Sequence, residues 1–571
     1  MKNTENSSDL NGIGDRRWHA SYVAGVPRSV EFEDITMPEI LTRTAEKYPE
    51  RSAILFMGKE ISYGELERLV NRFANVLISL GVKRGDRVAL LLPNIPQIVI
   101  AFYGIWRMGA IAVPNNPLNT DRELEYQLND SGSTILVTLD LLAPRMLALR
   151  PKTKLKQIIT CHINDYLPFP VKQLFPLIKK GMYVKYEKAP GYDQFLDLMK
   201  HASPEFKGAT PALDDIAFIP YTGGTTGISK GVVLTHRNTT CKNQIMEAWF
   251  GEMKGSYERE LAVFPFFHLA GIVAVMIFTV KMGWTDVLVP RPEPRAVLDM
   301  MIKYKTTVIP AVPTIYVGLL GLPEFKKADL SFVKGFFSAA APLAIETIND
   351  LKKATGATIV EAYGMTESTG LITLTPWKGT QKIGSAGVPL PNTDMKIVDL
   401  ETGEKEVPVG EEGEIIFRGP QMCQGYYNMP EETAKAKRNG WFHTGDIGKI
   451  DEDGYIYIVD RKKDMIIAGG YNIYPRDIDE VLFEHPKVLE ACAVGVPDKY
   501  RGETVKAFVV VKPGEALTEE ELNTYCRENL AAYKVPKIYE FIDALPKSSV
   551  GKVLRRELRD LEMKKMEKEV P

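Results

Sequence analysis

Short apolar runs alternate with helix patterns along most of the chain, and this alternation constrains the fold more than any other feature of the sequence. Ser62-Tyr-Gly-Glu65 has capping-box spacing before a helical apolar pattern, and Thr120-Asp-Arg-Glu123 repeats that spacing. Runs typical of buried strands occur at 88–92, 216–219, 287–289, 308–312, 335–338 and 358–360. This pattern predicts parallel sheets covered by helices, with ligands bound by the loops that follow the strands.

The pattern changes in the last third of the chain. From about Gly403, short strand-like pieces are separated by glycines, and Asp451-Glu-Asp-Gly454 has turn composition, which predicts a small antiparallel or barrel-like region. A charged group at 461–464 precedes a further alternation that ends in a basic segment at 547–559. We therefore expect an α/β fold with a polar tail at 1–30, a large N-terminal domain at 31–460 and a small mobile α+β domain at 461–571.

Composition excludes several classes of protein. With 571 residues, 45% hydrophobic, the chain can bury large cores, and its net charge of -2 lacks the positive field of a nucleic-acid binder. The five cysteines form no C-x-x-C, and the seven histidines show no metal-ligand spacing. The polar start does not resemble a secretory signal, and the apolar stretch 261–280 is interrupted by Pro265 and Gly271, so we expect it to be buried core. A reducing cytoplasm is the expected compartment.

A glycine- and threonine-rich segment, Tyr221-Thr-Gly-Gly-Thr-Thr-Gly-Ile-Ser-Lys-Gly231, directly follows the strand expected at 216–219. Its backbone N–H groups, hydroxyls and one lysine have the chemistry of a phosphate cradle. It is not a Walker A loop, because Gly231 follows Lys230. The predicted phosphate-binding residues are Thr222, Gly223, Gly224, Thr225, Thr226, Gly227 and Lys230.

A second motif, Glu361-Ala-Tyr-Gly-Met-Thr-Glu367, follows the strand expected at 358–360. Tyr363 offers a ring for base stacking, Thr366 a hydroxyl for a phosphate, and Glu367 a hard oxygen ligand for Mg²⁺. Alone, this stretch is also typical of a capped helix start. Ser338-Ala-Ala-Ala-Pro342 consists of small residues that admit a flat ring, although such residues alone are more typical of close packing.

Further polar groups occur near the C-terminal end. Asp446 has the acceptor chemistry for ribose hydroxyls, and Arg461 can reach ribose or phosphate oxygens. Lys552 follows a glycine in Leu545-Pro-Lys-Ser-Ser-Val-Gly-Lys552. Without context, the first two are typical surface ion-pair residues and the last segment is typical of a solvated basic tail.

In this order and with these spacings, the motifs resemble the AMP-forming adenylating superfamily, which includes acyl- and aryl-CoA synthetases, peptide-synthetase adenylation domains and firefly luciferase. The resemblance extends from about 32 to 559. Segments 460–467, 470–475 and 545–559 look most like bacterial long-chain fatty acid CoA ligases.

The resemblance implies a role for each matched position. Residues 222–230 hold the pyrophosphate end, Thr366 holds the α-phosphate, and Thr222 and Glu367 serve the Mg²⁺. Lys552 bridges the carboxylate and the α-phosphate in the first half-reaction only, and Lys463 marks a hinge near 460–463. His268 lies beside the acyl carboxylate or gates its tunnel; by itself, it is also typical of a buried core histidine. The remaining nucleotide and CoA positions are Ser338, Ala339, Ala340, Ala341, Pro342, Glu361, Ala362, Tyr363, Gly364, Met365, Asp446, Arg461, Gly469 and Gly470.

The expected reaction is ATP-dependent ligation of a medium- or long-chain fatty acid to coenzyme A through an acyl adenylate, with Mg²⁺. A ligase for cyclic or aromatic acids stays open, because the motifs read the nucleotide. Loading of the adenylate onto a carrier protein is disfavoured since no carrier domain follows 571, and a nucleotide- or lipid-binding protein without turnover could dispense with Lys552 and Glu367. The sequence is also compatible with a homodimer.

Two further segments bear on the substrate. In 166–186, apolar and aromatic residues are interleaved with Lys172, Lys179, Lys180 and Lys185, which suits either an ordinary surface insertion or contact with the inner face of an anionic membrane. After His268, the small residues Ala270, Gly271 and Ala274 suit either an open acyl channel or close helix packing.

Overall fold

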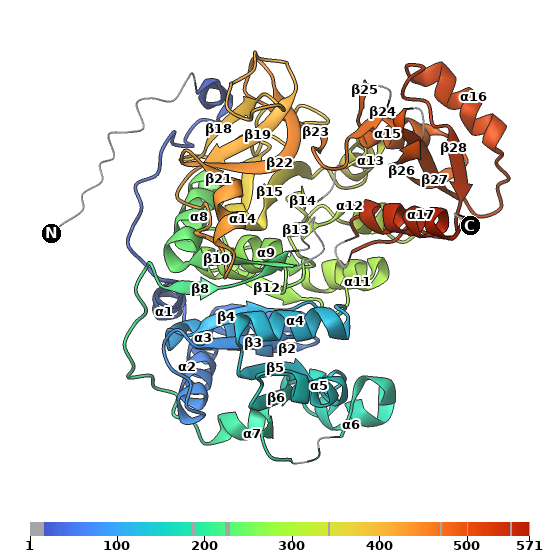
Figure 1. Cartoon of the computed structure of the whole chain (residues 1–571). Coiled ribbons are helices and arrows are strands. Elements are labelled where there is room, and N and C mark those ends of the chain that lie inside the picture. Colours follow the sequence, from blue (N-terminus) through green and yellow to red (C-terminus); the bar gives the residue numbers. More distant parts are fainter. Residues whose placement is uncertain are drawn as a thin grey trace. The chain divides into compact units, whose positions relative to one another are not determined.

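The computed structural model describes residues 16–185, 187, 189–222, 229–340, 343–468, 471–498, 501–548 and 551–569. Contacts divide the chain into two units (Figure 1). The first unit comprises Met1–Asp394, Arg418–Phe442 and Asp453–Tyr455, and the second comprises Met395–Phe417, His443–Glu452 and Ile456–Pro571.

The first unit contains a nine-stranded sheet that is parallel in its middle and antiparallel at both edges. Its strands β15, β14, β13, β11, β12 and β1 run parallel, and β2 on one side and β16 and β17 on the other pair antiparallel. The strands are β1 (Ser52–Phe56), β2 (Lys59–Ser62), β11 (Arg259–Ala262), β12 (Thr285–Leu288), β13 (Val308–Ala311), β14 (Gly335–Ser338), β15 (Thr358–Met365), β16 (Gly370–Leu374) and β17 (Val388–Pro389).

A second sheet has the order β20, β10, β8, β4, β3, β5, β6 and β7, with β9 paired to β10. It is parallel from β8 to β7, whereas β9, β10 and β20 are antiparallel additions. The strands are β3 (Arg87–Leu91), β4 (Ile111–Pro114), β5 (Ile135–Leu139), β6 (Gln157–Cys161), β7 (Tyr192–Gln194), β8 (Ile216–Phe218), β9 (Tyr221–Thr222), β10 (Lys230–Thr235) and β20 (Gly425–Tyr426).

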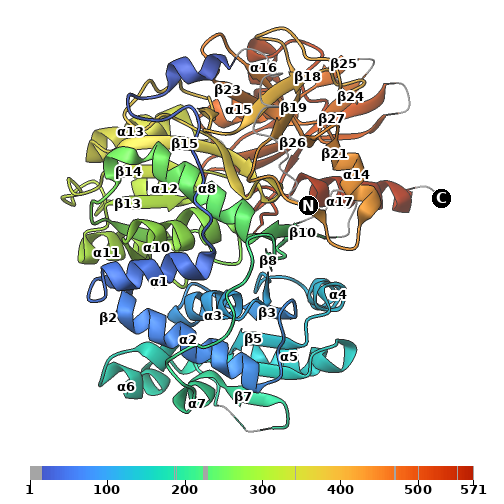
Figure 2. The same ribbon diagram turned by 90° about the vertical axis from the view of Figure 1, so that its left-hand side faces the viewer.

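The two helices whose starts the sequence predicts begin at the expected residues. Ser62 Oγ accepts the Glu65 N–H at the start of α2 (Tyr63–Ser79), and Thr120 and Glu123 form a reciprocal capping box on α4 (Asp121–Ser131). Every residue of α3 (Pro96–Arg107) is buried, because the helix lies with α1 (Met37–Lys47) between the two sheets (Figure 2). The other helices are α5 (Ala143–Leu149), α6 (Val171–Ile178), α7 (Phe195–Lys200), α8 (His236–Trp249), α11 (Pro294–Tyr304), α12 (Pro313–Leu320), α13 (Ile345–Thr355) and α14 (Pro430–Ala436).

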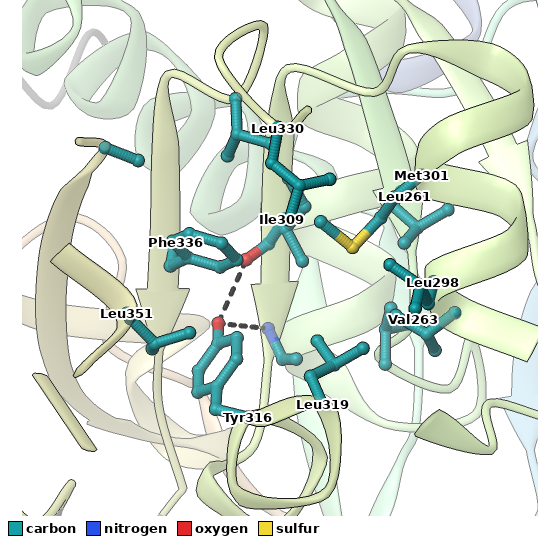
Figure 3. Packing of buried hydrophobic residues seen from close by; sticks show 14 of the residues in the cluster. Leu261, Val263, Leu298, Met301, Ile309, Tyr316, Leu319, Leu330, Phe336 and Leu351 are labelled. Atoms are coloured by element: carbon teal, nitrogen blue, oxygen red, sulfur yellow. Dashed lines mark hydrogen bonds between the residues drawn. The ribbon is translucent and has the colours of Figure 1, made fainter. Parts of the chain in front are cut away.

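A buried tyrosine in the hydrophobic core connects two neighbouring strands of the first sheet. The Tyr316 hydroxyl donates to the carbonyl oxygens of Ile309 and Phe337 at 2.9 and 3.0 Å, and it accepts the Ala311 N–H at 3.0 Å. Leu319, Phe336 and Leu351 lie around this ring (Figure 3). The tyrosine therefore ties β13 to β14 beneath the loops that follow both strands.

The apolar stretch 261–280 is buried core, as predicted. It comprises the end of β11 and a helix made of α9 (Leu269–Gly271), a π-helical segment (Ile272–Ile277) and α10 (Phe278–Met282), with nearly all its apolar side chains buried. Within the described ranges, no helix has the length and hydropathy needed to span a bilayer.

The antiparallel region predicted from Gly403 onward is present. β18 (Asp394–Val398), β19 (Gly413–Arg418), β21 (Lys437–Arg438), β22 (Trp441–Ile450) and β23 (Ile456–Arg461) form one sheet, and the turn predicted at 451–454 joins β22 to β23. In the second unit, β24 (Ile466–Ala468), β25 (Tyr471–Ile473), β26 (Val488–Asp498), β27 (Gly502–Val511) and β28 (Ile538–Phe541) form a further sheet, with helices α15 (Pro475–Glu484), α16 (Glu519–Asn529) and α17 (Arg555–Glu569). The predicted α/β class with an α+β C-terminal part is confirmed.

Two details differ from the sequence analysis. The strand expected at 358–360 continues to Met365, so the motif 361–365 lies on a strand, and the alternative of a capped helix start there is wrong. The first half of β15 pairs with β14, and its second half pairs with β16. The second pairing explains why the strand continues to Met365. Within the segment expected as a polar tail, Trp18 is buried. Its backbone lies so close to Gly454 that a side chain at position 454 would not fit.

Candidate active site

The predicted phosphate loop is closed at its base by a hairpin. β9 and β10 pair antiparallel with Thr222 opposite Lys230, and the Thr222 hydroxyl lies 3.4 Å from the Lys230 carbonyl oxygen. The loop follows β8, as the sequence predicts. Gly223, Gly224, Thr225, Thr226 and Gly227 lie outside the described residues. The hairpin thus fixes both ends of the segment to which phosphate binding is assigned.

Tyr426 connects this hairpin to Glu367. The Lys230 ammonium lies 4.9 Å from the centroid of the Tyr426 ring and forms an ion pair with Glu432. The Tyr426 hydroxyl donates to Glu367 Oε1 at 2.9 Å. Burial, and then the Glu367 carboxylate, raise the pKa of Tyr426, whereas the two lysines beside Glu432 lower the pKa of that carboxyl to about 2. Tyr426 therefore remains a hydrogen-bond donor to a buried carboxylate.

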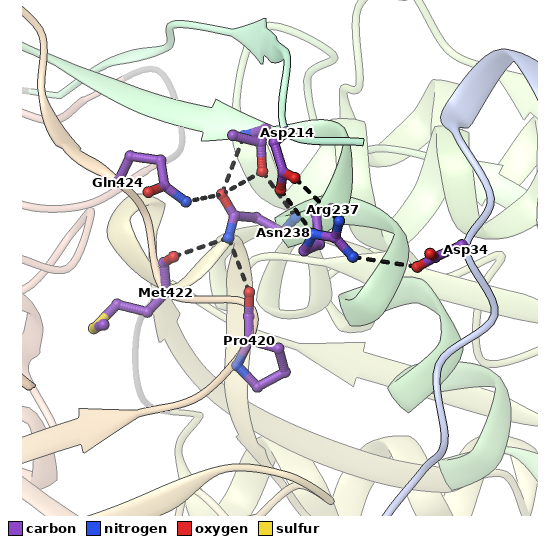
Figure 4. Close-up of polar contacts among 8 residues, drawn as sticks. Asp34, Asp214, Arg237, Asn238, Pro420, Met422 and Gln424 are labelled. Carbon is purple, nitrogen blue, oxygen red and sulfur yellow. Dashed lines mark hydrogen bonds and ion pairs between the residues drawn. The ribbon is translucent and has the colours of Figure 1, made fainter. Parts of the chain in front are cut away.

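The segment that carries Tyr426 is fixed by Asn238 at the first turn of α8 (Figure 4). Asn238 Nδ2 donates to the carbonyl oxygens of Pro420 and Met422 at 2.9 and 3.0 Å. The Cys423 N–H donates to the Glu367 carbonyl oxygen at 2.8 Å. Sequence reasoning missed this connection; the available signal was an aromatic pair after glycine in Gln424-Gly425-Tyr426-Tyr427.

The two motifs assigned to adenine lie side by side. Ser338 at the end of β14 is in register with Glu361 of β15, and the Leu343 N–H donates to Glu361 Oε1 at 3.3 Å. Ala341 and Pro342 lie outside the described residues. Ala362 and Tyr363 continue along β15 to Thr366 and Glu367, which form a single 3₁₀ turn with Ser368. One strand therefore joins the proposed adenine positions to the proposed metal ligand.

Backbone geometry at this edge explains one small residue, Gly364, and strains another, Ala340. A Cβ atom at Gly364 would lie 1.9 Å from the Gly370 carbonyl oxygen on β16, so only glycine fits. Ala340 adopts φ +73°, a left-handed conformation that costs an L-residue roughly 1–2 kcal/mol. Such residues cluster at binding sites, where the surrounding structure holds them in place.

An apolar cavity begins at these nucleotide-motif residues. Ser338, Ala339 and Ala362 line it, together with Ala270 and Ala274 of the π-containing helix, as predicted for an acyl channel. Gly271 follows the other alternative stated for this segment, close packing: a Cβ at this position would lie 2.3 Å from the Pro265 carbonyl oxygen. The other lining residues, which the sequence analysis did not identify, are Met246, Phe250, Met253, Glu260, Phe264, Phe278, Trp284, Val308, Pro310, Phe337, Leu371 and Leu374.

His268 caps the helix that carries Ala270 and Ala274. Its Nδ1 accepts the Ala270 N–H at 3.3 Å, so the neutral ring carries its proton on Nε2. The capping role accounts for a histidine at this position, and it also fixes the ring at the start of the cavity helix.

In the second unit, the two residues assigned to ribose form a pair. Asp446 of β22 is in register with Arg461 of β23, and Arg461 Nε lies 3.4 Å from Asp446 Oδ1. Lys552 ends a tight turn in which the Ser548 N–H donates to the Lys552 carbonyl oxygen at 2.8 Å. Gly551 has φ +72° in this turn, which explains the glycine before Lys552. Burial, and then the Arg461 guanidinium, lower the pKa of Lys552 to about 8.

The turn that presents Lys552 is anchored on both sides. Leu545 is buried before it, and Arg555, just after it at the start of α17, forms an ion pair with buried Asp479 of α15. The Lys463 carbonyl oxygen accepts from Arg559 Nη1 at 3.4 Å. Gly469 and Gly470 lie outside the described residues.

Comparison with known proteins places these features in one family. The AMP-binding enzyme family matches residues 41–427, and the AMP-binding enzyme C-terminal domain matches 477–552. A long-chain-fatty-acid–CoA ligase of Bacillus subtilis is 44% identical over 95% of this chain and 98% of its own length. A feruloyl-CoA synthase of an Amycolatopsis species is 37% identical over 90% of this chain and 97% of its own length.

A solved structure shows the same architecture. ATP-bound MatB from Rhodopseudomonas palustris aligns with a TM-score of 0.81 at 31% identity, covering 92% of this chain and 99% of that protein. The likeness therefore extends over both units, and it agrees with the resemblance carried by the motifs. Since the family matches cover most of the chain and the relatives align along nearly their whole length, the chain belongs to the AMP-binding enzyme family.

Proposed function

We propose that the chain ligates a long-chain fatty acid to coenzyme A through an acyl adenylate, with ATP as the other substrate. The observation that carries this proposal is the apolar cavity that begins at Ser338, Ala339 and Ala362, beside the motifs assigned to the nucleotide. An acyl chain in that cavity would place its carboxylate near the ends of β14 and β15, where the nucleotide motifs lie. We call this end of the two strands the nucleotide edge. The matching full-length relatives named as long-chain-fatty-acid–CoA ligases support the substrate class.

The residues at the nucleotide edge fit a magnesium–ATP complex. Glu367 is a buried carboxylate whose Oε1 accepts the Tyr426 hydroxyl, and Thr222 adds a hydroxyl at the base of the phosphate loop. One carboxylate together with substrate phosphates and water is a usual ligand set for Mg²⁺. The ion would neutralise charge on the phosphates, while Lys230 and the hairpin hold the pyrophosphate end and Thr366 the α-phosphate.

The first half-reaction is attack of the acyl carboxylate oxygen on the α-phosphorus, which releases pyrophosphate. Lys552 would bridge the carboxylate and the α-phosphate oxygens, and Asp446 and Arg461 would hold the ribose. The second half-reaction is attack of the CoA thiol on the adenylate carbonyl, which releases AMP. We assign 31–460 and 461–571 to two domains that rotate about 460–463 and so exchange Lys552 for a CoA tunnel at Gly469 and Gly470.

A ring acid is the second candidate substrate. Five aromatic side chains line the cavity, Phe250, Phe264, Phe278, Trp284 and Phe337, and the feruloyl-CoA synthase is a full-length relative. The deciding experiment measures pyrophosphate release with and without CoA for straight-chain acids, benzoate, cyclohexanecarboxylate and ferulate. Preference for the ring acids would overturn the fatty-acid assignment, and release that needs no acid would overturn both.

The pKa of Lys552 predicts an alkaline limit for adenylation. Because burial and Arg461 lower that pKa to about 8, Lys552 is charged below pH 8 and loses its charge above it. We expect kcat/KM for acid-dependent ATP–pyrophosphate exchange, measured without CoA, to fall about tenfold per pH unit above pH 9. Lys552→Ala is expected to abolish this alkaline decrease in kcat/KM. An unchanged decrease in that variant would refute its assignment to Lys552.

The predicted insertion, which the structure describes at residues 166–185, exposes an apolar face, and we propose that this face contacts an anionic membrane. Phe169, Leu177 and Ile178 are 82%, 67% and 68% exposed, on and beside α6. Lys179 and Lys185 are exposed nearby, whereas the Lys172 ammonium binds the Asp165 carbonyl oxygen at 2.8 Å and is therefore directed at the protein. Tyr186 lies outside the described residues. Since all five cysteines are buried and free, we place the protein at the cytoplasmic face.

Leu177→Glu is expected to weaken binding to phosphatidylglycerol vesicles about tenfold. The substitution removes an apolar side chain that would enter the interface, and it adds repulsion from anionic lipid. Sedimentation with vesicles measures the partition coefficient. Val317→Glu is the matched control, because Val317 is 56% exposed on α12. Equal losses in both variants, or no vesicle binding by the unaltered protein, would end the membrane proposal.

A further inference from the structure

The cavity assigned to the acyl group is mostly apolar, and Glu260 is the acidic residue among those that line it. Glu260 is 3% exposed, and Thr279 Oγ1 donates to its Oε2 at 2.5 Å. In the portion of the chain that the structure describes, Glu260 has no ion-pair partner. A carboxyl group without a cation inside an apolar cavity is costly unless it is neutral and hydrogen-bonded.

A second acidic residue lies beside Glu260 on the next strand. Asp286 of β12 is in register with Glu260 of β11, and it is 2% exposed. Burial raises the pKa of both carboxyl groups well above their usual range, and for Glu260 the neighbouring Asp286 raises it further. Burial therefore favours the protonated form of both side chains. A protonated carboxyl both donates and accepts hydrogen bonds, so Glu260 suits a neutral partner that does the same.

An independent observation points to a missing polar partner in the same cavity. Trp284 also lines it, and Trp284 Nε1 is buried without a hydrogen-bond acceptor among the described residues. Buried indole N–H groups usually find an acceptor. The Trp284 backbone is fixed, because the Tyr63 hydroxyl donates to its carbonyl oxygen at 2.6 Å. Two of the residues that line the cavity, Glu260 and Trp284, thus carry polar groups, and the Trp284 N–H lacks an acceptor among the described residues.

The strand register gives the depth of this polar group. Glu260 is in register with Val308, and Val308 with Gly335, which is three residues before Ser338 at the nucleotide edge. At about 3.3 Å per residue, Glu260 lies about 10 Å along the strands from that edge. A straight acyl chain that starts at the nucleotide edge would meet Glu260 partway along its length.

From this juxtaposition we propose that Glu260 is a specificity-determining residue, which recognises a hydroxyl group on the acyl chain about 10 Å from the carboxylate. Within the proposed fatty-acid substrates, the preferred class is therefore a hydroxylated acid over the unsubstituted acid of the same length. The hydroxyl would donate to or accept from the Glu260 carboxyl and accept from Trp284 Nε1. This inference rests on the proposed function, because it takes the cavity to be the acyl site.

The test compares ω-hydroxy acids with their unsubstituted counterparts, from hexanoate to dodecanoate. For each acid, calorimetry gives Kd and CoA-dependent pyrophosphate release gives kcat/KM. At one chain length we expect the hydroxy acid to be favoured about threefold to tenfold in both quantities. Glu260→Leu is expected to reverse this preference, and Glu260→Gln, which keeps a donor and an acceptor, to retain it.

Asp286→Asn is the matched control, because Asp286 is equally buried but is not one of the residues that line the cavity. It is expected to leave the preference unchanged. Unsubstituted acids favoured at every length by the unaltered protein, or a preference that survives Glu260→Leu, would overturn the inference. Absence of thioester formation with every acid would overturn the proposed function instead, and the Kd ratios would still decide the role of Glu260. If Glu260→Leu does not fold, the ratios of the unaltered protein and Glu260→Gln decide it.

Discussion

Lys552→Ala is expected to reduce adenylate formation about 100- to 1000-fold, the usual cost of removing one donor that stabilises developing charge. The Lys552 ammonium is presented by a turn that Leu545 and Arg555 anchor, so the substitution removes the charge without disturbing the turn. ATP–pyrophosphate exchange measures the first half-reaction. Thioester formation from supplied acyl adenylate measures the second, which is expected to stay close to that of the unaltered protein.

Lys547→Ala is the matched control for this prediction. Lys547 lies in the same segment, and its ammonium pairs with Glu490 in the same unit. Its loss is expected to change either half-reaction less than threefold, because an exposed ion pair contributes little. Equal losses in both half-reactions of Lys552→Ala would contradict the two-conformation role, and a similar loss in Lys547→Ala would indicate general damage to the segment.

The strands and helix starts were predictable because local chemistry decides them. The apolar runs at 88–92 and 335–338 form β3 and β14, and the capping residues Ser62 and Thr120 precede α2 and α4. The end of β15 was not predictable from local pattern. Its last residues, with glycine and polar side chains, form a strand because β16 pairs with them.

The nucleotide motifs were predictable because each is continuous in the sequence and follows a strand. The contacts that join the motifs were not, since they come from residues distant in the sequence. Tyr426 lies 59 residues from Glu367, and it meets Glu367 only because β20 pairs with β10. Glu260 is one of two charged residues in the four-residue strand β11, and its position in the cavity depends on the register with β13.

The small residues after His268 show most clearly what the sequence does not predict. Sequence spacing places 270 and 274 on one helical face, and both line the cavity. By sequence alone, Gly271 suits an open channel as well as these two alanines do. In the structure, the carbonyl oxygens of Phe264 and Pro265 occupy the space that a side chain at position 271 would need. Composition alone does not distinguish a small residue that leaves room for a ligand from one that leaves room for backbone.

Larger side chains are therefore expected to act differently at Ala274, which lines the cavity, and at Gly271, which packs against backbone. Ala274→Leu is expected to shift the preference toward shorter acids, because the added side chain occupies cavity volume that the end of a long chain would fill. Three displaced methylenes at about 0.8 kcal/mol each give roughly 2.4 kcal/mol, or about 50-fold in kcat/KM for the longest acids. The shortest acids and the KM for ATP are expected to be nearly unchanged. The measurement is kcat/KM over a series of straight-chain acids.

Gly271→Leu is the contrasting variant, because its side chain would meet backbone oxygens at 2.3 and 2.7 Å from the Cβ position. We expect it to lower the thermal midpoint and to reduce activity by the same factor at every chain length, as overpacking does. Ala274→Val, with a smaller added volume, should shift the preference less than Ala274→Leu while the thermal midpoint stays within a few degrees. A uniform loss in both Ala274 variants would mean that this helix face packs against the protein, and the acyl chain would then have to lie elsewhere than in the cavity beside Ser338 and Ala362.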